Sequence, residues 1–516
     1  MVVRGFVKKG EYFDSVTLMR IAAEVTKMDG IVDSAVVMGT GENISILKNS
    51  NLFLQEFKNS KDNDLLIAIK ADTNELIDDA LKKTNQLFAD MRNSPDESVE
   101  TNPSSLSSAI KKEPEANVCL ISIAGKYAGS EAKKALDNGL NVMLFSDNVS
   151  IETELKLKKY AKEKGLLVMG PDCGTAIING VPLAFANVVP KGNIGIVAAS
   201  GTGAQEVSSV IANSGAGVSQ CIGTGGRDVK TDIGGIMVIE AMRALAKDPQ
   251  TEVLVIVSKP PSADALEKIA KEIKNIQKPV VGILIGGDPK VLERVGAIAA
   301  TNLEEAGLIA AALSAKEDIA SVKDSQKQID EGLEKIACEI SKEIEGKYLR
   351  GLFSGGTLCD ETQLLFREYG LGDCYGNAPL NPDYVLEDVW RSKENTIIDM
   401  GEDEFTVGRP HPMIDFSLRK KKLASEAQDP NVAIIMMDVV LGYGSNLDPA
   451  KELCPEIKKA KTLSPKTAII CSICGTDGDP QGRKSVKSRL QEAGAVVLDS
   501  NAQASRLVSK IIGKLV

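Results

Sequence analysis

A small-residue loop, Ser200-Gly201-Thr202-Gly203, follows a β-branched run and opens a helical pattern. Amides at a helix N-terminus lack partners within the helix and lie at the positive end of its dipole, so this loop could hold a phosphate or a carboxylate. It is not a P-loop, because the Gly-Lys-Ser/Thr ending is missing, and it is not a complete GxGxxG, because Glu206 takes the last position. A similar loop, Ser354-Gly355-Gly356-Thr357, occurs later in the chain. The alternative interpretation is a tight turn capped by Ser or Thr.

A second glycine loop, Gly223-Thr224-Gly225-Gly226-Arg227-Asp228, ends in a cation and a carboxylate. Glycines let the backbone approach a ligand closely, and Arg227 could orient an oxyanion through charge-assisted hydrogen bonds. A purely structural turn accounts for the pattern equally well. We predict that Gly225, Gly226 and Arg227 belong to an anion site, with Arg227 as a catalytic candidate.

The one histidine of the chain, His411, stands in Gly408-Arg409-Pro410-His411-Pro412-Met413. Prolines on both sides prevent a helical interior, so we expect a loop. A lone loop histidine is commonly only solvated. Its place in a second sequence copy, at the strand end that matches Arg227, favours an acid/base or anion-binding role, and Arg409 and His411 join the catalytic candidates. A single imidazole excludes His-rich metal sites, and we predict no metal site.

The nine cysteines have no regular framework spacing. Cys173, in Gly170-Pro171-Asp172-Cys173-Gly174, could be a nucleophile, but we favour a small thiol packed below a turn. Cys471 and Cys474 have CxxC spacing without a second pair, and strand alternation places them on opposite faces. We therefore expect neither zinc binding nor redox chemistry there.

The composition narrows the classes of partner. Lys and Arg number 61 against 71 Asp and Glu, which gives a net charge of −10, and aromatic residues make up 4 % with one tryptophan, Trp390. Such a chain lacks the basic surface and the stacking platforms that bind nucleic acid. It contains no N-terminal h-region and no run of about 18 apolar residues, so we expect neither export nor a membrane partner. We predict a cytoplasmic protein with reduced thiols.

The elements that must position these loops are short β-branched runs that alternate with helical patterns. This alternation is typical of βαβ units with a mainly parallel sheet, whose ligands bind beyond the carboxyl ends of the strands. The clearest strands are residues 118–123, 141–145, 166–169, 194–198, 253–258 and 279–285. Before them, runs at 2–7, 35–38, 44–47 and 65–69 with a helix over about 15–27 indicate a small α/β unit. Residues 93–117, rich in Ser, Pro, Glu and Asn, are typical of a linker, and 315–347 of a connecting helix.

The sequence contains an internal repeat. GIVAASGTGAQE, from Gly195, resembles GLFSGGTLCDE, from Gly351, and three later segments match in the same order. Gly195 to Gly223 is 28 residues and Gly351 to Gly401 is 50, so the second copy carries 22 extra residues near 371–395. We predict two flavodoxin-like units that pack against each other around a shared cleft, with both small-residue loops facing one phosphorylated ligand.

Several motifs, taken in order, resemble a known family. GPDCG at Gly170, GIVAASGTGAQEV at Gly195, CIGTGGRD at Cys221 and KPVVGILIGG at Lys278 are similar to the α subunit of succinyl-CoA synthetase. The part from Arg350 resembles the carboxy-terminal ligase domain of its β subunit. The N-terminal stretch VVRGFVKKGEYFD with SVTLMRIAAEV resembles the FdrA family, in which these units are fused.

The resemblance lacks the phosphoryl carrier of the synthetase. There a histidine followed by Ala-Gly-Ala carries the phosphoryl group, whereas here Arg294 takes its position in Glu293-Arg294-Val295-Gly296-Ala297. A phosphohistidine cannot form at that position. Ser258-Lys259-Pro260 replaces the supporting glutamate-bearing loop, and no ATP-grasp domain is present. We expect that the chain does not activate a carboxylate with ATP by the usual route unaided.

The predicted fold class is α/β, with a Rossmann-like domain of CoA-binding type, two flavodoxin-like parallel-sheet domains of ligase type and a small N-terminal α/β unit. The predicted boundaries are 1–92 for the N-terminal unit, 93–117 for the linker, 118–190 for the Rossmann-like domain, 191–314 for the first flavodoxin-like domain, 315–347 for the connecting helix and 348–516 for the second flavodoxin-like domain.

The resemblance to FdrA implies a subunit of a carbamoyltransferase of ureide and purine catabolism, which converts oxalurate and phosphate to oxamate and carbamoyl phosphate. Phosphate attack on a ureido carbonyl needs oriented anions and an oxyanion environment rather than an enzyme-bound phosphate. Arg227, Arg294, Arg409 and the small-residue loops could supply these. The ligand-binding candidates are Gly170, Pro171, Asp172, Ser200, Gly201, Thr202, Gly203, Gly225, Gly226, Ser354, Gly355, Gly356 and Thr357.

The implied ligands are phosphate or carbamoyl phosphate, with CoA as an alternative and no other cofactor. The implied partners are small anionic substrates and the other carbamoyltransferase subunits, in an oligomer. Two other interpretations stay open. One is an acyl-CoA synthetase or CoA-binding protein that uses a partner for nucleotide, and the other is a non-catalytic assembly subunit with vestigial loops.

Overall fold

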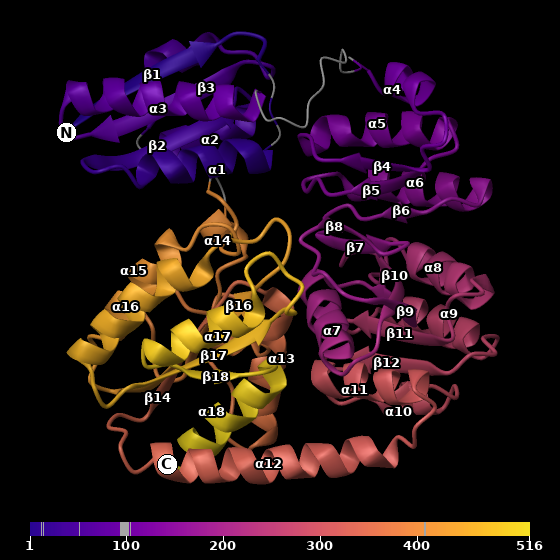
Figure 1. The fold of residues 1–516 in the computed structure, drawn as a ribbon. Coiled ribbons are helices and arrows are strands. Elements are labelled where there is room, and N and C mark those ends of the chain that lie inside the picture. The colour runs from indigo at the N-terminus through magenta and orange to yellow at the C-terminus, as the bar shows by residue number, and fades with distance from the viewer. Residues whose placement is uncertain are drawn as a thin grey trace. The chain divides into compact units, whose positions relative to one another are not determined.

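The computed structural model describes residues 1–11, 13, 15–50, 52–92, 103, 105–406 and 409–515. It has a mixed α/β architecture in which most strands of the larger sheets are parallel, which confirms the predicted fold class. The described chain forms two compact units. The N-terminal unit comprises Met1–Ala116 with Asp403–Asp415, and the main unit comprises Asn117–Glu402 with Phe416–Val516. Figure 1 labels their elements.

The N-terminal unit is built on a three-stranded antiparallel sheet in the order β1-β3-β2. Its elements are β1 (Val2–Lys8), α1 (Ser15–Thr26), β2 (Ile31–Met38), α2 (Gly41–Asn49), η1 (Gln55–Asn59), β3 (Leu65–Ala71), α3 (Asn74–Arg92), α4 (Leu106–Lys112) and α14 (Asp403–Thr406). The central strand β3, with the sequence LLIAIKA, is almost wholly buried. Apolar residues of α1 and α3 cover one face of it, and Leu47 with Phe57 cover the other.

Two expectations for this unit change. Residues 44–47 were expected to continue the strand pattern but lie in α2, because Ile44 and Leu47 are three positions apart and share one helical face against the sheet. In the predicted linker 93–117, residues 93–102 and 104 lie outside the described residues. The rest of it contains α4, whose N-terminus is closed by a capping box between Ser105 and Ser108.

The main unit begins with a parallel three-stranded sheet in the order β4-β5-β6. Its elements are β4 (Val118–Ile121), α5 (Gly125–Asp137), β5 (Asn141–Leu144), α6 (Ile151–Lys164) and β6 (Val168–Met169). The next two strands, β7 (Thr175–Ile178) and β8 (Val181–Ala184), form a hairpin on the neighbouring sheet, because β7 pairs with β10. The division between the sheets therefore follows β6, ahead of the predicted boundary at residue 190.

That neighbouring sheet has seven strands in the order β13-β12-β11-β9-β10-β7-β8. Its remaining elements are β9 (Lys191–Ala198), α7 (Gly201–Asn213), β10 (Val218–Gly223), α8 (Ile236–Lys247), β11 (Val253–Ser258), α9 (Ala263–Ile273), β12 (Val280–Leu284), α10 (Lys290–Glu293), β13 (Ile298–Ala299) and α11 (Leu303–Ser314). The strand β11, VLVIVS, is buried throughout, as a parallel strand covered on both faces must be.

A long helix, α12 (Ala320–Ile340), leads to a five-stranded parallel sheet in the order β15-β14-β16-β17-β18. The elements are β14 (Tyr348–Phe353), α13 (Gly356–Glu368), η2 (Pro382–Tyr384), β15 (Thr396–Asp399), α15 (Ser417–Glu426), β16 (Val432–Val440), α16 (Pro449–Leu463), β17 (Ala468–Cys474), α17 (Arg483–Glu492), β18 (Val496–Leu498) and α18 (Asn501–Leu515). The predicted connecting helix is thus observed as α12, and the extra segment at 371–395 holds η2.

The predicted repeat is confirmed by the strand order. The run β13-β12-β11-β9-β10 of the first sheet corresponds strand for strand to β18-β17-β16-β14-β15 of the second. The register agrees as well, because Ala198 at the end of β9 pairs with Gly223, and Phe353 at the end of β14 pairs with Asp399. We call the two sheets with their helices the first and second repeat.

The two repeats pack through the helices that follow their first strands, α7 and α13, which lie side by side (Figure 1). Each of these helices carries a buried glutamate. Its carboxylate accepts a hydrogen bond from the backbone amide of the first residue of the last helix in the other repeat. Glu206 of α7 accepts from Asn501 of α18 at 2.8 Å, and Glu361 of α13 accepts from Leu303 of α11 at 2.7 Å. We call these hydrogen bonds the reciprocal caps. They fix the predicted packing of the two repeats.

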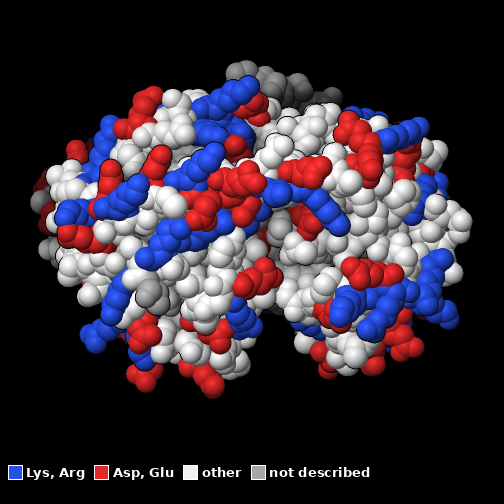
Figure 2. Space-filling view, turned by 90° about the horizontal axis from the view of Figure 1, so that it is seen from below, with Lys and Arg blue, Asp and Glu red and all other residues white. Residues whose placement is uncertain are grey.

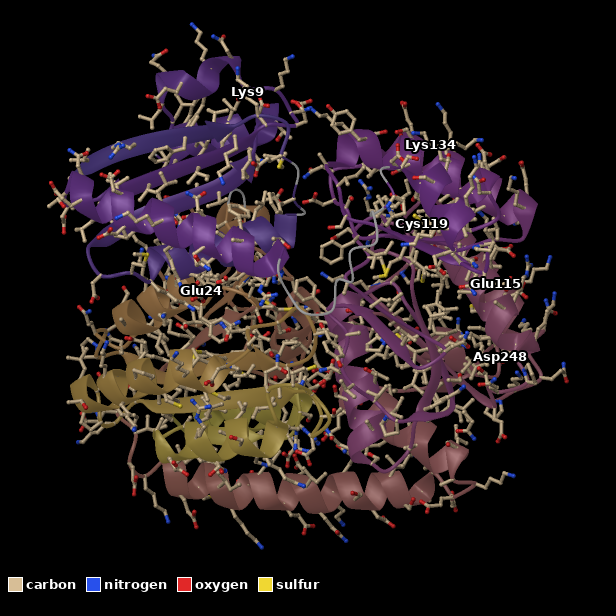
Figure 3. The ribbon with its side chains drawn as sticks, turned by 45° about the horizontal axis from the view of Figure 1, so that its top comes forward. Lys9, Glu24, Glu115, Cys119, Lys134 and Asp248 are labelled. Carbon is tan, nitrogen blue, oxygen red and sulfur yellow. The ribbon has the colours of Figure 1, made fainter. Side chains whose placement is uncertain are left out.

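The face of the molecule drawn in Figure 2 carries charged side chains of both signs. Basic and acidic side chains are interspersed over the face in Figure 2, without a continuous strip of one sign. On α5, Lys134 (Figure 3) pairs with Glu131, and Lys133 pairs with Asp137, as expected of an exposed helix face. None of the helices described is both long and apolar enough to cross a membrane.

Candidate functional site

A pocket of about 450 Å³ lies at the carboxyl ends of strands in the main unit. The turns after β5, β6, β9, β10 and β11 form its wall, and the second repeat contributes Thr357. Open α/β sheets bind ligands at this position, and the volume suits a small molecule. The pocket is lined by Asp147, Asn148, Pro171, Asp172, Cys173, Gly174, Thr175, Ala198, Ala199, Ser200, Gly201, Gly223, Gly225, Gly226, Arg227, Lys230, Lys259 and Thr357.

The pocket brings together residues from four of the predicted loops, those that begin at Gly170, Ser200, Gly223 and Ser354. Those that line it are Pro171, Asp172, Ser200, Gly201, Gly225, Gly226, Arg227 and Thr357. Gly170, Thr202, Gly203, Ser354, Gly355 and Gly356 are not among the lining residues. Sequence reasoning missed Asn148, Lys230 and Lys259 as site residues. Lys259 directly follows the last residue of β11, so the rule that ligands bind beyond strand ends could have found it.

The first small-residue loop forms the N-terminus of α7. Ser200 is its N-cap and accepts a hydrogen bond from the Gly203 amide at 3.0 Å, while its hydroxyl lies 2.5 Å from that of Thr357. Gly203 must be glycine, because a Cβ there would lie 2.7 Å from Ser200 Oγ and 2.9 Å from Val257. The amides of Gly201 and Thr202 have no acceptor within the helix. Of these two residues Gly201 lines the pocket, and its amide could receive an anion there.

The second small-residue loop has an acceptor of its own. The Ser354 and Gly355 amides each donate to the carboxylate of Asp438 at 2.8 Å, and the Ser354 hydroxyl donates to it at 2.9 Å. Asp438 is fully buried and paired with the equally buried Arg419. We predicted that this loop binds a ligand. In the structure, its amides and hydroxyl instead donate to Asp438, a buried carboxylate of β16.

Gly356, in the same loop, is required for packing. A Cβ at this position would lie 2.4 Å from Oδ2 of Asp399, the last residue of β15. Asp399 is 5 % exposed, and burial raises its pKa to about 7. Of this loop, Thr357 is the residue that reaches the pocket.

The glycine loop after β10 is fixed by a buried charge network. Lys158 of α6 donates to Glu154 at 2.8 Å, to Asp228 at 2.9 Å and to the Thr224 carbonyl at 3.0 Å. Asp228 also accepts the Val238 amide at the start of α8. All three charged side chains are at most 1 % exposed. The loop is therefore held between α6 and α8 before any ligand binds.

Arg227 has a structural partner as well as a place in the pocket. Its Nη2 lies 2.9 Å from the buried Glu154 carboxylate and donates to the Val149 carbonyl at 2.8 Å. The side chain is 40 % exposed, so part of the guanidinium remains open to the pocket. A guanidinium has five N–H donors, and two contacts leave donors for an oxyanion.

Lys259 enters the pocket from the end of β11. Its Nζ lies 2.6 Å from Oδ2 of Asp360, on α13 of the other repeat. Burial acts to lower the pKa of Lys259, but the Asp360 carboxylate outweighs it and the pKa stands above its usual range. Burial raises the pKa of Asp360 itself. Lys259 is thus an ammonium cation held between the pocket and a largely buried carboxylate.

The pocket cysteine is not suited to nucleophilic work. Cys173 is 2 % exposed, and its thiol faces the carbonyls of Thr175 and Gly223 at 3.5 Å. Burial raises its pKa to about 12, so the thiolate is scarce at neutral pH. Cys471, also buried, has its pKa raised to about 12. Cys119, on β4 (Figure 3), does not line the pocket.

Three predicted cationic or imidazole residues lie elsewhere. Arg409 and His411 belong to the segment that packs in the N-terminal unit, and neither lines the pocket. His411 Nδ1 accepts the Met413 amide at 3.2 Å, which holds it in a local turn. Gly408 lies outside the described residues. Arg294, at the end of α10, is exposed and does not line the pocket either.

Comparison with known proteins places the chain in a family. The Escherichia coli protein YahF, which has no characterised function, is 41 % identical over 520 residues, covering 100 % of this chain and 99 % of YahF. The chain belongs to the YahF family. Residues 190–286 match the CoA binding domain family, 352–511 the CoA-ligase family, and 1–103 the family described as AllF, heavy metal-associated domain.

Other similar proteins match this YahF family member over part of its length or at lower identity. The α subunit 2 of an ADP-forming succinate–CoA ligase from Archaeoglobus fulgidus is 30 % identical over 181 residues, 34 % of this chain and 61 % of that subunit. A solved dinucleotide-forming acetyl-coenzyme A synthetase 1 from Ca. Korarchaeum cryptofilum is 15 % identical, with a TM-score of 0.34, over 77 % of this chain and 83 % of that one. The match to the succinate–CoA ligase α subunit, together with the CoA binding domain and CoA-ligase families, supports the resemblance to a fused succinyl-CoA synthetase scaffold.

The heavy-metal description does not fit the residues of the N-terminal unit. Residues 1–103 contain neither cysteine nor histidine, the ligands on which soft metal ions depend. Among the residues that the structure describes, His, Cys, Asp and Glu side chains form no group of three suited to a metal ion. We derive no metal chemistry from this unit.

The pocket residues do fit a phosphate-bearing group. Gly201 and Gly226 leave room there, because the nearest atom to a Cβ at either position would be 3.7 Å away. Gly225 has φ +80° and would place a Cβ 2.4 Å from the Pro171 carbonyl, so only glycine fits that turn. Backbone amides, Arg227 and Lys259 then surround an open space, which suits phosphate or the phosphates of CoA.

Proposed function

We propose that this chain is a subunit of a carbamoyltransferase that converts oxalurate and phosphate to oxamate and carbamoyl phosphate. The observation that carries the proposal is the strand-end pocket, in which glycine turns, Arg227 and Lys259 surround a space for a small oxyanion. The identity of the ureido substrate rests on the resemblance to FdrA. The CoA-ligase and CoA-binding matches support an enzyme-related scaffold of this kind.

The proposed reaction transfers a carbamoyl group to phosphate. An oxygen of hydrogen phosphate attacks the ureido carbonyl carbon, the bond from that carbon to the oxamate nitrogen breaks, and the proton released by the phosphate goes to that nitrogen. In the proposal, the Gly201 amide and the Lys259 ammonium hold the phosphate. Arg227 orients the second oxyanion, and the fixed backbone donors favour the charged transition state.

The amino acids at two positions favour this transfer over phosphoryl relay. Arg294 stands where the synthetases carry their phosphohistidine, and it lies outside the pocket. Cys173 is buried with a raised pKa, so it is no substitute nucleophile. A direct attack of phosphate on the substrate needs neither group.

The second candidate function is an acyl-CoA synthetase or CoA-binding subunit that uses a partner for nucleotide. The matches to the CoA binding domain and CoA-ligase families favour it. In that case the loops at Gly201 and Gly225 would hold phosphates of CoA, and Arg227 and Lys259 would neutralise their charge.

One pair of assays separates these functions. The purified chain is mixed with candidate partner subunits, and carbamoyl phosphate is measured from oxalurate and inorganic phosphate, with and without this chain. Formation that requires the chain supports the carbamoyltransferase, and equal formation by the partners alone contradicts it. ATP- and CoA-dependent thioester formation would support the synthetase instead. Inactivity in both assays, with a stable complex between chain and partners, would favour an assembly subunit.

A further inference from the structure

We infer that Lys259 binds the anionic ligand of this pocket. Asp360 of the other repeat positions the Lys259 side chain and lowers its affinity for the anion. The inference rests on the proposed function only in requiring an anion in the pocket. It assigns a binding role to Lys259, at the junction of the two repeats, which the sequence did not single out as a site residue.

The position of Lys259 supports a role toward a ligand. It lines the same pocket as Ser200, Gly201 and Thr357, so it reaches the end of α7 at which an anion would be held. Its side chain is 45 % exposed, so the ammonium is open to the pocket while it contacts Asp360. Arg227 is paired with the buried Glu154, whereas Lys259 is paired with Asp360, which is 14 % exposed, so Lys259 is less tied to the core than Arg227.

The surroundings of Asp360 explain why it lowers the affinity of Lys259 for an anion. Its side chain is 14 % exposed, and Lys259, at 2.6 Å, is the partner that partly compensates its burial. A second carboxyl, Asp399, lies close enough to interact electrostatically with both. Carboxylates behind an ammonium offset part of its positive charge, so a ligand anion feels a weaker attraction than Lys259 alone would give.

The pair also has a geometric consequence. Lys259 follows β11 of the first repeat, whereas Asp360 lies on α13 of the second. A flexible four-carbon side chain reaches its productive position only when something restrains it. Asp360 supplies this restraint from across the junction, so Asp360 is a positioning residue and Lys259 a binding residue.

Two opposite effects on phosphate affinity test the inference. Binding of inorganic phosphate to the purified full chain is measured by calorimetry at pH 7.5. Lys259→Gln is expected to weaken binding by about tenfold or more, and Lys259→Arg to retain most of it. Asp360→Asn removes the competing charge, while its amide oxygen can still accept a hydrogen bond from Lys259 and hold it in place, so this variant is expected to bind phosphate at least as tightly as the wild type. Lys268→Gln, an exposed lysine of α9 in the same repeat, is the matched control and should bind normally.

The outcomes separate the inference from the proposed function. Unchanged binding in Lys259→Gln would overturn the inference, and so would a loss in Asp360→Asn as large as that in Lys259→Gln. Circular dichroism and thermal unfolding of each variant exclude misfolding as the cause. Phosphate binding that depends on Lys259, combined with no carbamoyl transfer by the reconstituted enzyme, would leave the inference intact and reject the proposed reaction. No phosphate binding by the wild type would overturn both.

Discussion

Arg227 combines two tasks, and their separation is measurable. It pairs with Glu154 and bonds the Val149 carbonyl, which ties the loop after β10 to the turn before α6. It also lines the pocket. A substitution therefore changes both the loop and the charge available to a ligand.

Arg227→Ala is expected to weaken phosphate binding by about 1–3 kcal/mol, because a charge-assisted hydrogen bond is lost. Calorimetric titration with phosphate measures the loss. Arg243→Ala, which removes an arginine that pairs with Glu240 and Glu272 in the same repeat, is the control and should bind normally. Equal affinity of Arg227→Ala and wild type would reject Arg227 as a ligand-binding residue.

At the scale of single residues, local patterns predicted part of the site. The loop at Ser200 and the glycines before Arg227 line the pocket because their role depends on a strand end and a tight turn, which the sequence shows locally. The loop at Ser354 was misjudged, because the carboxylate that occupies its amides, Asp438, comes from a distant strand. The position of Lys259 directly after β11 could have identified it as a site residue, but its contact with Asp360 of the other repeat is not visible in the local sequence.

At the scale of elements, the network around Lys158 holds α6, the glycine loop and α8 together. Lys158→Met is expected to lower the free energy of unfolding by about 3–5 kcal/mol, because the buried Asp228 loses its cation and the buried Glu154 keeps only Arg227. Urea unfolding followed by circular dichroism measures the change. Lys162→Met, on the exposed side of the same helix, should cost well under this amount. A loss no larger than that of Lys162→Met would show that the network is not what fixes these elements.

The reciprocal cap of α18 makes stability depend on pH. Burial raises the pKa of Glu206 from 4.5 to about 8, so between these values the folded protein retains a proton that the unfolded chain has released. Stability from this group therefore falls as pH rises through that window. We expect the wild type to lose about 1–3 kcal/mol of unfolding free energy between pH 5.5 and 8 from this group.

Glu206→Gln is expected to reduce that loss, because the amide oxygen can still accept from Asn501 without ionising. Urea unfolding at the two pH values, compared between variant and wild type, measures the difference. Glu331→Gln, an exposed change on α12, should leave the pH dependence as in the wild type. A pH dependence of Glu206→Gln equal to that of the wild type would contradict the assignment.

The elements themselves were largely predictable. The local sequence is enough to predict many of them. Examples are the β-branched runs of β9, β11 and β12, the apolar spacing of α12 and the turn residues between elements. The segment at 44–47 was harder, because four apolar-patterned residues fit a strand and a helix alike until the sheet face that they cover is known. The pairing of β7 with β10 depends on long-range contacts that no local pattern carries.

At the scale of the whole molecule, the contacts between the repeats predict whether the two fragments stay associated after the chain is cleaved between them. The turn at residues 315–318, between α11 and α12, is exposed. A protease site placed there and cleaved after folding is expected to leave two fragments that elute together from a size-exclusion column, because the reciprocal caps and the α7–α13 contact remain. Uncut protein is the control. Fragments that separate in native buffer would contradict the junction described above.

The reciprocal caps also bear on how the protein is made. Each repeat begins a helix whose first amide finds its acceptor only in the other repeat, so neither repeat is complete when it is produced without its twin. Two separate genes would have to match their expression levels to avoid a surplus of one half with an uncapped, exposed face. When both repeats are translated as one polypeptide, they are made in a one-to-one ratio and at a high effective concentration of each for the other.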